Sequence, residues 1–331
     1  MRGGLIAIGV IGLMAVGFIF VRGPSPAISV APEVIFDIGP LAVTNTMFTS
    51  WVVVVLICVA AVLIGRSARL VPSGLSGAAE GLIIGFYEMI AGIVGEEKAR
   101  RFFPLVATIF LYVLVSNYFA LLPFSNVIGV PEPGHGDKQA VFQQISIAGI
   151  DIAMIPLNPD EVDTGAHDQV IVATEDGGDF SGVLAPLFRS VNTDVNAPLA
   201  LAIFSFIFVE FWGFQALGFG YLRKFFNVGR LLRGNPMGVI DVFVGLLELI
   251  SEFIRMVSFT FRLFGNMFAG EVLILMGTFL APFVLVNVFY GLELLVGLIQ
   301  AFVFAMLTLV FAQMAVQRHG DSQEAHSGAH G

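Results

Sequence analysis

The sequence predicts an all-α polytopic membrane protein with about five to six membrane helices, the last two long and tilted as a hairpin. Of its 331 residues, 57% are hydrophobic and 12% are charged, which is about half the charged fraction of a soluble domain. Runs of nearly uncharged residues recur, and each is long enough to cross a hydrocarbon core of ~30 Å as a helix. A large soluble protein would instead need surface helices with charged faces.

The N-terminal segment, residues 1–27, is predicted to be a signal peptide or an extra N-terminal membrane helix. Residues 5–21 form an apolar run behind Arg2. The tripeptide Ser25-Pro26-Ala27 loosely fits a small-x-small cleavage site. In either case, the chain after residue 22 is expected outside the cytoplasm.

Residues 28–123 are predicted to hold the first membrane helices and a cytoplasmic basic loop. Residues 47–64 and 102–122 contain no charged side chain. Residues 75–95 combine glycines and two glutamates with apolar residues, which is typical of an interfacial or re-entrant helix.

Residues 197–317 are predicted to form the C-terminal membrane helices. Residues 197–222 are apolar except for Glu210. Residues 239–316 are almost continuously apolar, with a break expected at Ala281 and Pro282.

The loops predict the orientation. Residues 65–101 and 221–238 are basic, whereas residues 124–196 contain eleven Asp or Glu and only two basic residues. The positive-inside rule places the basic loops in the cytoplasm and the 124–196 segment outside as an acidic external loop. Its stretches VFQQISIAGIDIAMIPL and QVIVATEDGGDF alternate apolar and polar residues and favour a small strand pair. The tail, 318–331, is expected to be cytoplasmic and disordered.

Ionisable residues in the last two apolar segments need a reason, because each costs ~2.5–3.5 kcal/mol at the centre of a membrane helix. They are Glu248, Glu252, Arg255, Arg262, Glu271 and Glu293. For Glu252 and Arg255 an alternative is that they lie near a span end and extend to the headgroups.

Helical spacing arranges these residues. Glu248, Glu252, Arg255, Arg262 and Asn266 fall within about 80° on one helix face. Glu271 lies about 180° from Arg262, and on the last helix Glu293 and Gln300, seven residues apart, share a face. The pattern favours two polar half-paths, offset sideways, with Arg262 between them.

Residues 258–271, SFTFRLFGNMFAGE, closely resemble the signature of subunit a of the F-type ATP synthase. Three further stretches resemble the same family in order and spacing: SNYFALLPF (116–124), NTDVNAPLALA (192–202) and LIQAFVFAMLTLVF (298–311). The resemblance covers roughly residues 40–317. Two features depart from the family: the external loop is longer than its minimum, and Glu occupies both position 271 and position 293, where the family usually places an acidic residue or His, often one of each.

The resemblance implies a stator subunit of a rotary ATP synthase, which is not an enzyme on its own. Such a subunit provides two offset half-channels for proton movement to and from carboxyl groups of a c-subunit ring, and so couples proton flow to ATP synthesis. The implied surroundings are the c-subunit ring, b-type peripheral stalk subunits, the remaining synthase subunits and the lipid bilayer of a bacterial cell membrane. No cofactor, metal or nucleic acid is implied.

The resemblance also implies roles for individual residues, with Arg262 as the essential arginine. The outer path would be lined by Glu271, Glu293, Gln300 and Asn266. The inner path would be lined by Glu248, Ser251 and Ser258. Further candidates are Glu210, Glu252, Arg255 and Asn117.

Two other function classes predict features that these residues lack. A stand-alone secondary cation/proton transporter predicts an internal repeat with paired broken helices, and the sequence contains none. An intramembrane protease would need Gly-x-Ser-x-Gly or His-Glu-x-x-His, and neither occurs in the spans. The net charge of −9 and the lack of a basic tract do not favour nucleic-acid binding.

Overall fold

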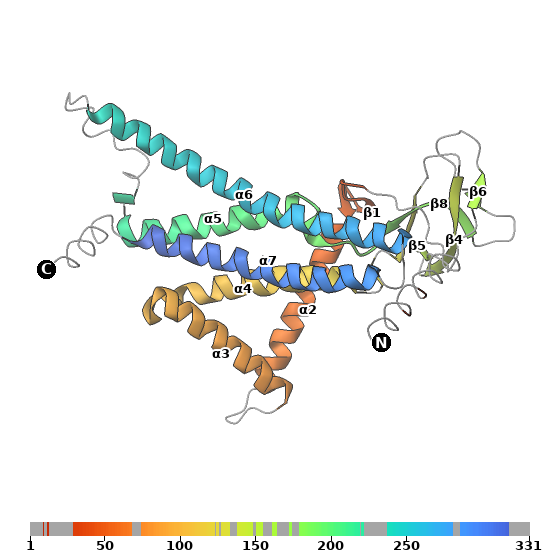
Figure 1. Ribbon diagram of the computed structural model, residues 1–331, viewed down its shortest axis with the longest axis horizontal. Coiled ribbons are helices and arrows are strands. Elements are labelled where there is room, and N and C mark those ends of the chain that lie inside the picture. Colours follow the sequence, from red (N-terminus) through yellow and green to blue (C-terminus); the bar gives the residue numbers. More distant parts are fainter. Residues whose placement is uncertain are drawn as a thin grey trace. The chain divides into compact units, whose positions relative to one another are not determined.

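In the part of the chain that the computed structural model describes, helices α2 to α7 and two antiparallel sheets are present (Figure 1). The structure describes residues 9, 12, 29–67, 74–122, 124–125, 127–132, 138–147, 150–154, 161–163, 172–173, 179–218, 220–221, 237–280 and 285–317. The predicted 1–27 segment, apart from residues 9 and 12, and the predicted tail at 318–331 lie outside the described residues.

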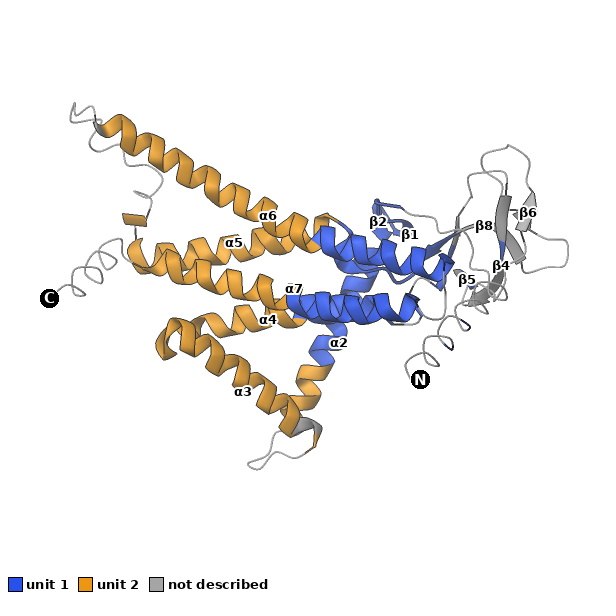
Figure 2. Cartoon of the chain, in the orientation of Figure 1, with its two compact units in different colours: residues 1–59, 112–194, 264–299 blue, residues 60–111, 195–263, 300–331 orange. Residues whose placement is uncertain are grey.

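Contacts divide the chain into two compact units, which Figure 2 colours separately. Unit 1 comprises residues 1–59, 112–194 and 264–299. Unit 2 comprises residues 60–111, 195–263 and 300–331. Helices α2, α4, α6 and α7 each contribute residues to both units.

Among the described residues, five helices are long and apolar enough to cross a membrane, which agrees with the predicted number of about five to six, although one of them, α3, was predicted to be interfacial or re-entrant. They are α2 (Asn45–Ser67), α3 (Leu75–Val94), α4 (Glu96–Ala120), α5 (Asn196–Leu217) and α7 (Leu285–Val316). Helix α6 (Met237–Leu280) carries Glu248, Glu252, Arg255, Arg262 and Glu271; its 44 residues correspond to about 66 Å at 1.5 Å per residue. The fold class is therefore confirmed: this is a multi-pass helical membrane protein.

The residues predicted to be interfacial or re-entrant form α3, a helix of 20 residues. It ends at Gly95, whose φ of 82° lies in the left-handed region, and α4 begins at the next residue. The expected break near Pro282 falls within residues 281–284, between α6 and α7 and outside the described residues.

The predicted strand pair is part of a larger sheet in unit 1. The order is β6-β4-β5-β3-β8-β7, and the pairs are antiparallel. The strands are β3 (Ile128–Glu132), β4 (Lys138–Ile147), β5 (Ile150–Met154), β6 (Glu161–Asp163), β7 (Val172–Ala173) and β8 (Asp179–Pro186). The alternating stretch 141–157 covers most of β4 and all of β5, and in this hairpin Ile145 lies opposite Ile152. Phe142 and Ala153 are buried, and Leu184 packs against them.

A second hairpin, β1 (Val34–Ile38) and β2 (Leu41–Thr44), leads directly into α2. The backbone N–H of Asn45 donates to the carbonyl of Glu33, and its side-chain amide donates to the carboxylate of Glu33 at 2.8 Å. The hydroxyl of Thr46 donates to Asp194 at 3.1 Å. These bonds attach the start of α2 to the segment before β1 and to the turn before α5.

Candidate functional site

A buried ion pair lies in unit 1 between Arg189, three residues after β8, and Glu271 on α6. Nε of Arg189 donates to both carboxylate oxygens, at 3.2 and 3.3 Å. The side chains of Arg189 and Glu271 are 5% and 12% exposed. Nη2 donates to the carbonyl of Ser29 at 2.6 Å and Nη1 to that of Ala31 at 3.1 Å. Every guanidinium nitrogen thus has an acceptor, as a buried arginine requires.

Glu293 on α7 carries another buried carboxyl group of unit 1. The residue is 4% exposed, and its Oε2 has no hydrogen-bond partner among the described residues. Helix α6 makes room for it at Gly270, where an added Cβ would overlap the carboxyl group. The Glu293 carboxyl group therefore packs against the α6 backbone at Gly270, the residue before Glu271.

Both carboxyl groups line one small cavity in unit 1. Its volume is about 30 Å³, roughly twice the space that one water molecule requires. Its other lining residues are Ala120, Leu121, Ser190, Met267, Ile274 and Tyr290. The hydroxyl of Ser190 is buried without a hydrogen-bond partner among the described residues. Polar groups and sufficient room make this cavity suitable for ordered water.

Asn117 on α4 holds three elements of unit 1 together. Its amide nitrogen donates to the carbonyl of Gly297 on α7 at 3.2 Å. Its amide oxygen accepts from the side chain of Asn192, in the turn before α5, at 2.7 Å. Asn117 and Asn192 are 0% and 1% exposed. A buried amide group that lost one of these partners would be left without a hydrogen bond, which is costly. Asn117, a predicted site residue, therefore has a structural role in orienting α7.

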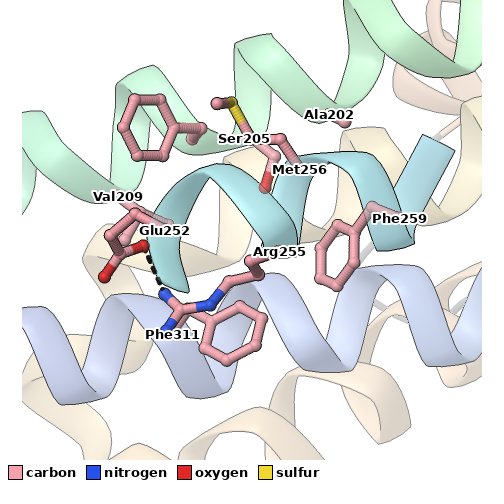
Figure 3. Close-up of a pocket in the computed structure, with 9 residues that line it drawn as sticks. Ala202, Ser205, Val209, Glu252, Arg255, Met256, Phe259 and Phe311 are labelled. Atoms are coloured by element: carbon pink, nitrogen blue, oxygen red, sulfur yellow. Dashed lines mark hydrogen bonds and ion pairs between the residues drawn. The ribbon is translucent and has the colours of Figure 1, made fainter. Parts of the chain in front are cut away.

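Unit 2 contains a different ion pair, between Glu252 and Arg255 of α6 (Figure 3). Nη1 of Arg255 donates to the Glu252 carboxylate at 2.6 Å. The guanidinium carbon lies 3.7 Å from the ring centroid of Phe311 on α7, a cation–π contact. Residue Glu252 is 3% exposed, so it faces protein. The alternative that Glu252 extends to headgroups is therefore wrong for this side chain.

The Glu252–Arg255 pair borders a small cavity between α5, α6 and α7 of unit 2 (Figure 3). Most of its lining is apolar, and Ser205 is its one hydroxyl group. That hydroxyl shares a hydrogen bond of 2.9 Å with Thr308 of α7. On this mostly apolar side of α6, Glu252, Arg255 and Ser205 therefore each have a protein partner.

Glu210 on α5 interacts with Tyr221, just beyond that helix. Burial, followed by the negative charge of Glu210, raises the pKa of the Tyr221 phenol. The ring of Tyr221 also packs on Gly213, where an added Cβ would lie 2.8 Å from it. Tyr221 is therefore a neutral hydrogen-bonding group beside Glu210 at physiological pH.

The predicted stripe on α6 is divided by burial. Glu252 is buried, Glu248 and Arg255 are half-buried, and Arg262 and Asn266 are exposed. At 100° per residue, Glu252 and Arg262 lie at opposite edges of the stripe, about 80° apart. The stripe thus straddles the boundary between the packed side of α6 and its open side. Ser251 and Ser258, predicted for the inner path, are also exposed.

Arg262 lies on the open side of α6 without an ion pair in the described part of its unit. Its nearest aromatic partner is Phe259, with the guanidinium carbon 5.9 Å from the ring centroid. The neighbouring Phe261 is 59% exposed. Gln300, predicted for the outer path, is 4% exposed on α7 in unit 2. Of the predicted site residues, Glu271 and Glu293 share the cavity of unit 1, and Glu252 and Arg255 share that of unit 2.

Sequence reasoning missed Arg189, Ser190, Asn192 and Tyr290. One signal pointed to Arg189: it is the only arginine between residues 124 and 196. It also lies five residues before Asp194 of the NTDVNAP stretch. An arginine next to the start of an apolar span in an acidic segment is a candidate partner for a buried carboxylate.

Comparison with known proteins places these residues in a family context. The family model for the ATP synthase A chain matches residues 47–313. A protein named ATP synthase subunit a from Moorella thermoacetica is 26% identical over 291 residues, covering 88% of this chain and 99% of the relative. Proteins of the same name from Gloeobacter violaceus and Helicobacter acinonychis are 28% and 27% identical, covering 89% and 85% of this chain and 93% and 96% of theirs.

Proposed function

The chain belongs to the ATP synthase A chain family, and on this basis we propose that Arg262 separates two half-paths for protons along α6 and α7. The chain is a proton-translocating stator subunit of the synthase and is not an enzyme on its own.

The exposure of Arg262 is the single observation that carries the proposal. A guanidinium is charged at every relevant pH, and it is costly against lipid. Arg262 has no ion pair in the described part of its unit, and its surroundings on α6 are exposed apolar side chains such as Phe261. A partner with a carboxyl group of its own would offset that cost. We assign this face of α6 to the c-subunit ring.

Arg262 would then act on a carboxyl group of that partner. A carboxyl group favours the protonated form against lipid and the ionised form beside a cation. A ring carboxyl that reaches Arg262 releases its proton to one half-path and takes a new one from the other before it returns to lipid. The attraction, about 1.4–4 kcal/mol, is comparable with the ~2.3 kcal/mol available per charge at 100 mV.

The two half-paths use different parts of the chain. In this proposal Glu271 and Glu293, with the cavity that they line, belong to the outer half, together with Asn266 and Gln300. The inner half begins at Glu248, Ser251 and Ser258. The paired or hydrogen-bonded Glu252, Arg255 and Asn117 position the helices, and the neighbour Tyr221 suggests the same for Glu210.

The surroundings of the chain are proposed from the family and from its charges. The partners are the c-subunit ring, b-type peripheral stalk subunits and the rest of the synthase in a bacterial plasma membrane. The basic loops would lie in the cytoplasm, the 124–196 segment outside, and the C-terminus in the cytoplasm.

Replacement of Arg262 tests the function. In inverted vesicles holding the whole synthase, Arg262→Ala is expected to lower ATP-driven proton pumping by about 10- to 1000-fold. This fold-change corresponds to the loss of an electrostatic attraction of about 1.4–4 kcal/mol between Arg262 and the ring carboxyl group. Arg262→Lys retains the positive charge but lacks the planar guanidinium group, so its pumping rate should lie between those of the parent and Arg262→Ala. The control is Arg100→Ala, because the side chain of Arg100 is 77% exposed.

Two results would contradict the proposal. Normal pumping by Arg262→Ala, with parent amounts of the chain in the membrane, would remove Arg262 from the path. Proton transport by the purified chain alone in liposomes would favour a stand-alone transporter instead.

A further inference from the structure

The two carboxyl groups of the unit 1 cavity have different surroundings. Glu271 receives Nε of Arg189 at 3.2 and 3.3 Å. Glu293 has a buried oxygen with no hydrogen-bond partner among the described residues. Two carboxyl groups on the same cavity therefore differ in whether a fixed cation holds them.

Arg189 is itself fixed from several directions. Its backbone N–H donates to the hydroxyl of Thr49 on α2 at 3.2 Å. Its two terminal nitrogens donate to the carbonyls of Ser29 and Ala31. The guanidinium therefore cannot turn away from Glu271 without leaving carbonyl acceptors unpaired, which is costly at a site that is 5% exposed.

Protonation of Glu271 would leave this buried guanidinium without its counter-ion. A buried charge that loses its partner is strongly unfavourable. Protonation of Glu293 carries no such penalty, because no cation is among the residues that line its cavity. The polar and titratable groups facing it there are Glu271 of α6, Ser190 of the turn before α5 and Tyr290 of α7, while the end of α4 and the next residue contribute only the apolar Ala120 and Leu121.

We infer that Arg189 is a positioning residue that holds Glu271 as a fixed anion, and that Glu293 is the proton-carrying carboxyl group of the outer half-path. The inference rests on the proposed function. A proton from cavity water binds a carboxylate oxygen of Glu293 and leaves to the next acceptor, so the group returns to its starting state. Glu271 keeps its negative charge throughout and favours positive charge in the cavity.

A double-mutant cycle on the whole synthase in inverted vesicles separates these roles. Arg189→Gln and Glu271→Gln each leave one buried charge unpaired, so each lowers ATP-driven pumping. The double variant leaves no unpaired charge and is expected to pump about tenfold faster than either single variant, within the coupling measured for contacting charged pairs. Arg189→Lys keeps the charge and should exceed Arg189→Gln. Glu293→Gln should stop pumping even with the ion pair intact.

The matched control is the exposed pair of Arg100 and Glu96, whose side chains are 77% and 78% exposed. Arg100→Gln, Glu96→Gln and their double variant should show no coupling. The amount of chain in the membrane, measured by immunoblot, normalises every value. If Arg189→Gln does not accumulate in the membrane, two comparisons of pumping rate still test the inference. The double variant must pump faster than Glu271→Gln, and Glu293→Gln must pump more slowly than Glu271→Gln.

Two outcomes overturn the inference. A double variant no faster than Glu271→Gln would mean that Glu271 itself carries protons. Pumping by Glu293→Gln at or above the level of Glu271→Gln would remove Glu293 as the carrier. Either result leaves the proposed function standing if Arg262→Ala still fails to pump, whereas normal pumping by Arg262→Ala would overturn the proposed function itself.

Discussion

At the scale of single residues, Gly270 sets the place of a carboxyl group on another helix. An added Cβ at this position would overlap the Glu293 carboxyl group, which is the far end of a flexible side chain. The helix can therefore accept a methyl group by displacing that end. Glycine here allows the Glu293 carboxyl group to lie against the backbone of α6, because small residues permit such close approach.

Gly270→Ala is expected to move the Glu293 carboxyl group without preventing assembly. We predict a loss of proton pumping of at least about tenfold, since a misplacement of ~1 Å in a reacting group costs up to about 10²-fold in rate. Pumping in inverted vesicles and an immunoblot of the chain would measure the two effects.

The control for this substitution is Gly92→Ala on α3, where an added Cβ meets nothing within 4 Å. It should pump like the parent. Parent-level pumping by Gly270→Ala would show that the position of the Glu293 carboxyl group does not limit proton flow.

At the scale of elements, α6 is joined to α7 in unit 2 through Arg255. The guanidinium donates to Glu252 on its own helix and lies on the ring of Phe311 on α7. Phe259 of α6 also meets Phe304 and Phe311, with ring centroids 4.9 and 5.7 Å apart. Charge and aromatic packing therefore coincide along this part of the hairpin.

Arg255→Ala is expected to destabilise the chain by about 3 kcal/mol, because it leaves Glu252 buried without its cation. Phe311→Leu should cost less, about 0.5–2 kcal/mol for the cation–π contact plus lost packing. The measurement is the temperature at which the detergent-purified synthase loses this subunit. A Glu252→Gln/Arg255→Gln variant as unstable as Arg255→Ala would contradict the role given to the unpaired charge.

The elements themselves were largely predictable, and their partners were not. Hydrophobic length alone predicts α2, α4, α5 and α7, and helical spacing puts Glu271 on the side of α6 opposite Arg262. The pairing of Glu271 with Arg189 joins residues 82 positions apart, and no periodicity reports such a contact. The same limit applies to the sheet, where alternation identifies the β4–β5 hairpin but not the pairing of β4 with β8.

At the scale of the whole molecule, the distribution of charge predicts how the chain crosses the membrane. The chain has one cysteine, Cys58, so Cys58→Ser gives a background for single-cysteine labelling. Met154 on β5 is 39% exposed and lies in the predicted external loop. Arg100 on α4, with its side chain 77% exposed, lies in a predicted cytoplasmic loop.

An impermeant maleimide should label Met154→Cys in right-side-out vesicles and Arg100→Cys in inverted vesicles. The physical reason is that basic loops are retained on the cytoplasmic side during insertion. Gel mobility of the labelled chain is the measurement, and permeabilised vesicles of both kinds provide the control. Labelling of both cysteines from the same side would contradict the predicted orientation.

The bonds from Arg189 to Glu271 and to the carbonyls of residues 29 and 31 also bear on the order of synthesis. At about 5–20 residues per second, Glu271 leaves the ribosome about 4–16 s after Arg189, which it follows by 82 residues. Burial of Arg189 before Glu271 has been made would leave its charge uncompensated, so this arginine is expected to stay in contact with water until then. The second half of α6, which carries Glu271, therefore supplies the counter-ion that makes burial of Arg189 favourable.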